Sequence, residues 1–302
     1  MLEHLLGNGH SPTLVVTGPD KPAGRKQELT PSPVKKVAQT HNLPLAQPER
    51  PVELLSRSEL QEAEFIVLAA YGNILPKELV ELPPKGALNV HPSLLPLYRG
   101  PSPERGALLN GDQKTGVTVI LMDEQIDHGP ILAQREFFIP KDMRHEELHA
   151  ALGELGGELL VETIPAWLGG TIVPKEQNHG KATFTRKMTK EDGRIDWSKP
   201  AEYIERQVRA LYPWPGTFTF FKDAQEKQQM LKILKANVLM QTKPGLVKPG
   251  LVFLTQNEKL AVQTKENTLI VEELQLEGGK PMNSKEFLLG HKGLVGSVFV
   301  YS

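Results

Sequence analysis

Apolar segments of strand type alternate with helical patterns along the first part of the chain, and this alternation limits the possible folds most strongly. Several runs have the length and composition of buried strands, at residues 12–17, 64–70, 86–90, 116–122 and 130–139. Helical patterns occur at the N-terminus and over residues 32–42 and 145–168. Strands that alternate with helices predict an α/β domain with a mainly parallel sheet and helices on both of its faces.

The pattern changes in the last third of the chain. A helix is predicted over residues 198–211, with Ser198 as its N-cap. Short strands separated by Gly and Pro turns follow it, which is typical of a small antiparallel barrel or sandwich. A chain of 302 residues also exceeds the usual size of one hydrophobic core. We therefore expect a first domain over residues 1–173, a linker over 174–189 and a second domain over 190–302.

The composition excludes several classes of protein. The chain has no cysteine, which rules out disulfides, thiolate catalysis and cysteine-bound metals and makes an intracellular setting the default. The longest apolar run, near residues 65–75, is too short to span a bilayer, and no secretory signal opens the chain. We therefore expect no membrane partner. A net charge of −1 gives no indication of a nucleic-acid partner from the chain as a whole.

The stretch NVHPSLLPLYRG, residues 89–100, presents an amide and an imidazole two residues apart at the end of a predicted strand. Side chains at i and i+2 of a strand share one face, so Asn89 and His91 should point the same way. Ligands of open α/β sheets bind beyond the carboxyl ends of the strands, and Asp127 follows the next strand. These three groups suit acyl or formyl transfer to an amine: the amide and a protonated imidazole would stabilise an oxyanion, and the carboxylate would take or relay the amine proton. The alternative is that Asn89 caps a turn and His91 is an ordinary loop histidine.

A second motif, HEELH at residues 145–149, matches the H-E-x-x-H pattern of zinc peptidases. Helical spacing would place both histidines on one face, with Glu146 as the base. The extended zinc-peptidase pattern is absent, because leucine stands at the position of its glycine. A place near the helix start also favours an exposed surface for His145. The helix is explained as a core-packing element by Leu148, Leu152, Leu155 and Leu159. We therefore predict no metal site.

The segment 17–35 has the composition of a long loop rich in Gly, Pro and basic residues. Long loops inside a compact domain are usually functional or disordered. Lys21, Arg25 and Lys26 would contact a phosphate backbone, or else belong to a solvated charged loop. No P-loop and no G-x-G-x-x-G occurs, so the sequence fingerprints of nucleotide-cofactor binding are missing.

Nearly the whole chain resembles the methionyl-tRNA formyltransferases of the folate-dependent formyltransferase family. NVHPSLLPLYRGPSP (89–103) and IDHGPIL (126–132) are similar to the family's catalytic signature, and AAYGNILP (69–76) is similar to its folate-pocket segment. Enzymes that formylate glycinamide ribonucleotide or aminoarabinose share this signature. PDKPAGR followed by TPSPVK resembles the loop by which the tRNA enzymes grip the acceptor stem. The single-domain purine enzyme also lacks a second domain of the kind predicted here.

The resemblance implies a Rossmann-like formyltransferase domain followed by an OB-like domain that contributes to tRNA binding. It implies transfer of a formyl group from 10-formyltetrahydrofolate, the co-substrate, to the α-amine of methionyl initiator tRNA by a monomeric cytoplasmic enzyme. The catalytic residues that carry over are Asn89, His91 and Asp127, and the tRNA contacts are Lys21, Arg25 and Lys26. The folate-binding positions are Ala70, Tyr71, Gly72, Ile74, Leu75, Pro76, Ser93, Leu94, Leu95, Pro96 and Asp123. Two alternatives stay open: the same chemistry on an amino-sugar nucleotide, and a catalytically impaired tRNA-binding homologue.

The chain departs from the family's pattern at two places. Gln27 and Glu28 stand where the family's loops continue with basic residues, which predicts weaker and less salt-dependent tRNA binding. The family also begins with a strand before its first helix, whereas Met1 opens directly on the helix here. We expect a truncated or mis-started sequence and a gap at the central position of the sheet.

Overall fold

The computed structural model describes residues 1–23, 28–223, 225–240 and 248–300. The chain divides into two compact units. The first comprises Met1–Pro103, Lys114–Phe138 and His149–Arg186, and the second comprises Glu104–Gln113, Ile139–Leu148 and Lys187–Ser302. No helix among the described residues has the length and apolar character needed to cross a bilayer.

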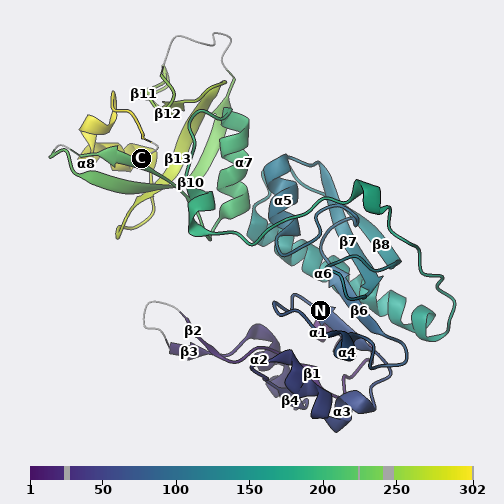
Figure 1. The fold of residues 1–302 in the computed structure, drawn as a ribbon. Coiled ribbons are helices and arrows are strands. Elements are labelled where there is room, and N and C mark those ends of the chain that lie inside the picture. Colours follow the sequence, from purple (N-terminus) through teal and green to yellow (C-terminus); the bar gives the residue numbers. More distant parts are fainter. Residues whose placement is uncertain (24–27, 224, 241–247, 301–302) are drawn as a thin grey trace. The chain divides into compact units, whose positions relative to one another are not determined.

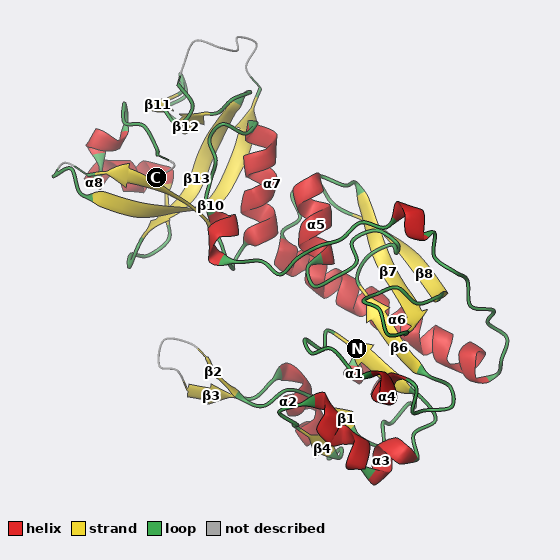
Figure 2. Cartoon of the chain, in the orientation of Figure 1, coloured by secondary structure: helices red, strands yellow, loops and turns green. Residues whose placement is uncertain are grey.

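The main sheet of the first unit has four strands in the order β5-β6-β7-β8. Figures 1 and 2 label β6, β7 and β8 of this sheet. Their bounds are β5 (Ile66–Ala69), β6 (Ala87–His91), β7 (Lys114–Leu121) and β8 (Ile131–Phe138). β5 and β6 run parallel, whereas the β6–β7 and β7–β8 pairs are antiparallel. The predicted α/β class is confirmed. The expectation of a mainly parallel sheet is wrong for this sheet, because two of its three strand pairs are antiparallel.

Two smaller ladders lie outside this sheet. β1 (Val15–Val16) pairs in parallel with β4 (Leu45–Ala46), and β2 (Lys21–Ala23) pairs antiparallel with β3 (Glu28–Thr30). Among the described residues no backbone ladder joins the β1–β4 pair to β5, so the expected break in the sheet is present. Apolar side chains pack across this region instead, in a cluster that includes Val16, Ala46, Ile66 and the buried Leu79.

The longest helix, α6 (His145–Leu168), contributes its residues from His149 onward to the first unit. It buries Leu152 and Leu159, as the leucine pattern predicts. At Gly156 it comes close to β6 and β7, because an added Cβ would lie 3.0 Å from Val90 and 3.4 Å from Val117. The shorter helices of this unit are α1 (Leu2–Gly7), α2 (Pro33–Thr40), α3 (Ser58–Gln61) and α4 (Lys77–Val80), with the 3-10 turns η1 (Pro51–Ser56) and η2 (His179–Lys181).

The second unit contains an antiparallel sheet of order β11-β12-β13-β10-β9, with β14 paired to β13. Figure 1 labels β10, β11, β12 and β13 of this sheet. Its strands are β9 (Thr217–Lys222), β10 (Gln228–Leu239), β11 (Val252–Leu254), β12 (Leu260–Gln263), β13 (Thr268–Leu276) and β14 (Met282–Asn283). Bridges from Val298 to Leu251 and from Val300 to Phe220 connect the last described residues to both ends of the sheet. This closure confirms the predicted antiparallel barrel.

The helices of the second unit are α5 (Pro103–Asn110), α7 (Ala201–Leu211) and α8 (Ser284–Gly290), with the 3-10 turns η3 (Lys190–Gly193) and η4 (Lys292–Leu294). α7 covers the barrel core, where Ile204 packs with buried residues of the sheet such as Leu231 and Val271. The predicted start of this helix is wrong by a few residues. Its N-cap is Pro200, because the Ser198 hydroxyl donates to Asp196 Oδ1 at 2.6 Å instead of capping the helix.

Candidate functional site

Two side chains at the end of β6 contact the same carboxylate. The Asn89 amide donates from Nδ2 to Asp127 Oδ1 at 3.1 Å. His91 Nδ1 lies 3.5 Å from that oxygen. The structure thus brings together the three residues that the sequence grouped, and the two-residue strand period explains why Asn89 and His91 face the same way.

Asp127 reaches this position from the loop between β7 and β8. Its φ of 50° lies in the left-handed region, which Asp tolerates better than most residues. The loop turns back tightly onto β7, because an added Cβ at Gly129 would lie only 1.9 Å from the Leu121 carbonyl oxygen. The second carboxylate oxygen, Oδ2, accepts a hydrogen bond from the backbone N–H of Gly100 at 2.8 Å. Both oxygens of Asp127 are therefore held by protein groups.

The tautomer of His91 follows from its second contact. His91 Nε2 lies 2.9 Å from the carbonyl oxygen of Tyr98, which only accepts hydrogen bonds. Nε2 therefore carries a hydrogen, and Nδ1 is the nitrogen that faces Asp127. His91 is only 5% exposed, so its interactions are weakly screened by water.

The loop that follows His91 is held by internal hydrogen bonds. The Ser93 hydroxyl donates to the Leu97 carbonyl at 2.6 Å, and Thr118 Oγ1 donates to the Ser93 carbonyl at 2.6 Å. Ser93 and Leu95 are buried, and Leu94 and Pro96 are partly buried. These four positions were predicted to bind folate, which stays a prediction. What the structure shows is that hydrogen bonds of Ser93 and Thr118 stabilise the loop that carries them.

The other predicted folate positions surround a more open region. Ala70, Gly72 and Ile74 are exposed, whereas Tyr71, Leu75, Pro76 and Asp123 are partly buried. The Tyr71 hydroxyl oxygen is enclosed and has no hydrogen-bond partner in the part of the chain that the structure describes. Asp123 Oδ2 lies 2.6 Å from His128 Nδ1.

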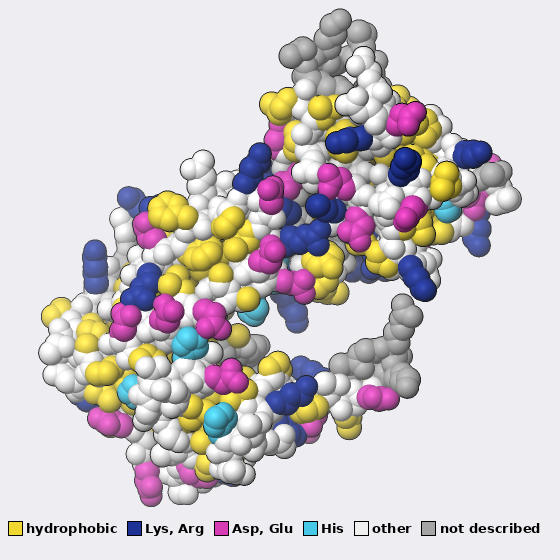
Figure 3. Space-filling view, turned by 180° about the vertical axis from the view of Figure 1, so that it is seen from behind, with side chains coloured by type: hydrophobic (Ala, Val, Ile, Leu, Met, Phe, Trp, Pro, Cys, Tyr) yellow, Lys and Arg dark blue, Asp and Glu magenta, His cyan; other side chains and the backbone are white. Residues whose placement is uncertain are grey.

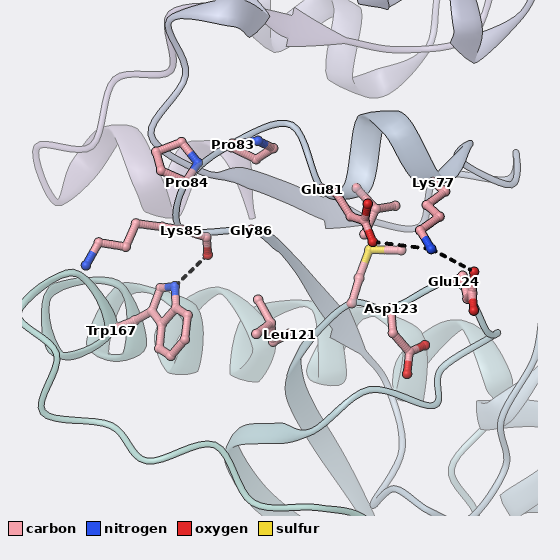
Figure 4. Close-up of a pocket in the computed structure, with 12 residues that line it drawn as sticks. Lys77, Glu81, Pro83, Pro84, Lys85, Gly86, Leu121, Asp123, Glu124 and Trp167 are labelled. Carbon is pink, nitrogen blue, oxygen red and sulfur yellow. Dashed lines mark hydrogen bonds and ion pairs between the residues drawn. The ribbon is translucent and has the colours of Figure 1, made fainter.

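A cavity of about 530 Å³ adjoins this region (Figure 4). Asp123 and Met122 line it from the β7–β8 loop, Trp167 from α6, and Lys77 from α4. Lys77 Nζ lies 3.5 Å from Glu124 Oε2, and attraction to this carboxylate, and then to that of Glu81, raises the pKa of Lys77. Tyr71, Leu75 and Met122 pack in one apolar cluster, which connects the predicted folate segment to the cavity wall.

Two further predictions concern residues outside this site. Lys21 lies exposed in β2, while Arg25 and Lys26 lie outside the described residues. The expectation that His145 is exposed is wrong: its side chain is buried, and Nε2 lies 3.2 Å from Glu104 Oε2 within the second unit. α6 thus starts with a histidine packed beside a carboxylate.

Models of known families match both parts of the chain. A model described as "Formyl transferase" matches residues 2–164, and one described as "Formyl transferase, C-terminal domain" matches residues 187–292. Together with the fold and the Asn–His–Asp cluster, these matches define the class: the chain belongs to the formyl transferase family.

Similar proteins narrow this class. A methionyl-tRNA formyltransferase of Chloroflexus aurantiacus is 45% identical over 293 residues, which are 96% of this chain and 92% of that one. One of Thermodesulfovibrio yellowstonii is 42% identical over 96% of this chain and 92% of its own length. The resemblance found in the sequence is confirmed, and within the family the chain groups with the methionyl-tRNA formyltransferases.

Solved structures agree with the fold. An N-formyltransferase of Helicobacter canadensis, in complex with folinic acid and dTDP-3-aminofucose, matches with a TM-score of 0.63 and 19% identity. The match covers 89% of this chain and 93% of that one. HypX of Aquifex aeolicus, in complex with tetrahydrofolic acid, matches with a TM-score of 0.57 and 20% identity over 83% of this chain and 43% of its own.

Proposed function

We propose that the chain transfers the formyl group of 10-formyltetrahydrofolate to the α-amine of methionyl initiator tRNA. The observation that carries the proposal is the Asp127 carboxylate shared by Asn89 and His91 in a formyltransferase fold. The choice of methionyl-tRNA as the formyl acceptor is supported by the similar proteins, which are methionyl-tRNA formyltransferases. The proposal includes a monomeric enzyme acting in the cytoplasm.

The first step forms the new C–N bond. The amine nitrogen attacks the formyl carbon, and the carbonyl electron pair moves onto the oxygen. One Asn89 Nδ2 hydrogen is donated to Asp127, and the other remains for this oxyanion. Protonated His91 stabilises the same oxyanion by its positive charge, while its two ring nitrogens face the Tyr98 carbonyl and Asp127. Asp127, next to both groups, takes the proton that the attacking amine loses.

The second step breaks the old C–N bond. The oxyanion electron pair re-forms the carbonyl, and the bond to the folate nitrogen breaks. That nitrogen leaves with a proton relayed from Asp127, so the carboxylate returns to its starting state. The burial of His91 strengthens these charge interactions relative to water.

For the folate we propose the positions predicted from the sequence around Tyr71 and Asp123. The Tyr71 hydroxyl, which has no hydrogen-bond partner among the described residues, fits a polar group of a ligand. The exposed side chains of Ile74 and Ile126 fit its apolar surface. For the tRNA we propose Lys21, Arg25 and Lys26 as phosphate contacts, with further contacts from the barrel of the second unit.

The test is incubation of the purified chain with 10-formyltetrahydrofolate and methionyl initiator tRNA, with product read by mass spectrometry. We expect formyl-methionine on the tRNA. A parallel reaction contains a dTDP-amino sugar as the acceptor. Formylation of the sugar alone would replace the tRNA proposal by the amino-sugar alternative, and product from neither acceptor would indicate an impaired homologue.

A further inference from the structure

A buried glutamine holds the backbone of the loop that carries Asp127. Gln177 Nε2 donates to the carbonyl oxygen of Asp127 at 2.9 Å and to that of Gly129 at 2.8 Å. The glutamine is only 5% exposed, and all three residues belong to the first unit. One side chain thus bridges the turn on both sides of His128.

Arg99 fixes the orientation of this amide. Gln177 Oε1 accepts from Arg99 Nη2 at 2.7 Å and from Nε at 3.3 Å. A guanidinium has only donors and a carbonyl oxygen only accepts, so one amide orientation alone satisfies both sides. Arg99 is 4% exposed and also contacts His179 Nδ1 through Nη2 at 2.9 Å. Arg99 and Gln177 are therefore a buried hydrogen-bonded pair in which the Gln177 amide has one defined orientation.

Arg99 and its neighbour also reach the carboxylate end of Asp127. The backbone of Arg99 bonds to Thr183 and Thr185, at 2.9 Å and 2.7 Å. The next residue, Gly100, donates to Asp127 Oδ2. Both the main chain and the side chain of Asp127 are thus held from the Arg99–Gly100 and Gln177 positions.

The conformation of Asp127 makes such support useful. A φ of 50° lies in a sparsely populated backbone region, so contacts that hold the loop help to keep the carboxylate in place. Small displacements of a reacting group reduce rates strongly, because the reacting atoms must meet within a narrow range of distance and angle.

We propose that Gln177, oriented by Arg99, is a positioning residue that aims the Asp127 carboxylate at Asn89 and His91. The inference rests on the proposed function, because it concerns the efficiency of that reaction. It predicts that loss of the two donated hydrogen bonds lowers turnover and leaves substrate binding largely intact.

The test variant is Gln177→Glu. It keeps the side-chain length and the acceptor for Arg99, but it turns a carboxylate oxygen toward the two carbonyls. We expect kcat to fall by about 10- to 100-fold, the scale of a misplacement of about 1 Å, with a much smaller change in the KM for 10-formyltetrahydrofolate.

The second unit offers a matched control in Gln207→Glu. Gln207 is also 5% exposed, and its Nε2 donates to the carbonyls of Asp192 and Arg194 at 2.7 Å and 3.2 Å. The same chemical change there should lower stability and leave kcat near that of the wild type. An equal loss of kcat in both variants would mean a general structural effect and would overturn the inference.

A double-mutant cycle with Asp127→Asn, followed in single-turnover reactions, separates positioning from folding. If Gln177 acts through Asp127, Gln177→Glu should change the rate of the Asp127→Asn enzyme by less than about twofold. If Gln177→Glu lowers the rate of the Asp127→Asn enzyme as strongly as that of the wild type, the positioning role is refuted. If Gln177→Glu does not fold, Gln177→Met is measured in the same cycle. Failure of the wild-type chain to formylate the tRNA would refute the proposed function itself. It is distinguished from failure of the positioning role because it appears without any substitution.

Discussion

The contacts of Asp127 define the site at the scale of single residues. Oδ1 accepts from Asn89 and faces His91, and Oδ2 accepts from the Gly100 backbone. The Nε2–H of His91 is donated to the Tyr98 carbonyl, so Nδ1 is the nitrogen that faces Asp127. One carboxylate therefore contacts both the amide of Asn89 and the imidazole of His91.

Alanine substitution tests these roles directly. We expect His91→Ala and Asp127→Ala each to lower kcat by about 10²–10⁴-fold, the usual contribution of a general acid–base group. The two losses should not multiply in the double variant, because the residues act as one unit. His41→Ala, at an exposed histidine of the same unit, serves as the control and should leave the rate unchanged. Near-normal turnover in both single variants would contradict the mechanism.

At this scale the sequence predicted Asn89, His91 and Asp127 because two local rules apply to them. The two-residue period of a strand places Asn89 and His91 on one face. Because functional groups of open α/β sheets gather beyond the carboxyl ends of the strands, Asp127, which follows the next strand, was expected nearby. Gly100 and Gln177 were not singled out, although the arginine–glycine pair at the end of the 89–100 stretch was a usable signal. Gln177 contacts the Asp127 loop only in the folded chain, because it lies far from that loop in the sequence. A pattern of local spacing therefore could not have identified it.

At the scale of elements, the glycines of α6 have different surroundings. Gly153 has open space where a Cβ would be, whereas a Cβ at Gly157 would lie 2.7 Å from the His4 ring of α1. His4 also contacts Glu154 at 2.5 Å, and this hydrogen bond lowers the pKa of the Glu154 carboxyl. α1 thus rests on α6 at Gly157.

This contrast predicts opposite effects for the same substitution. Gly153→Ala should raise the stability of the chain by about 0.5–1 kcal/mol, because alanine favours the helix without a new contact. Gly157→Ala should lower it by about 1–3 kcal/mol, because α1 must move away. Thermal unfolding of the two variants measures both effects. A rise in Tm for both would mean that α1 does not pack there.

The presence of the strands and helices was predicted more securely than the direction of the strands or the first residue of a helix. Hydrophobic runs located β5, β6, β7 and β8, but a buried apolar strand has the same pattern in a parallel and an antiparallel sheet. The antiparallel direction of β7 and β8 was therefore missed. The start of α7 was misplaced because Ser198 can bond either to a helix N-terminus or, as it does, to the neighbouring Asp196.

At the scale of the whole molecule, charge does not indicate where a polyanion would bind. The chain has 35 basic and 36 acidic residues, and basic and acidic side chains are interspersed on the face shown in Figure 3. A nearly neutral chain has no strong long-range field to attract nucleic acid. Binding of tRNA must then depend on a few local contacts, such as those proposed for the 17–35 segment.

This argument predicts a limited dependence of tRNA binding on salt. Loss of one phosphate contact in Arg25→Ala should raise the KM for methionyl-tRNA at unchanged kcat and reduce the slope of log K against log salt by about 0.7–0.9. Gln27→Lys should do the reverse, because it adds a positive charge next to Arg25 and Lys26. Arg50→Ala, at an exposed arginine paired with Glu53 at 3.3 Å, is the control. Binding titrations at several salt concentrations give each slope. Equal slopes for the wild type, Arg25→Ala and Gln27→Lys would show that this segment is a solvated loop and that the tRNA is held elsewhere.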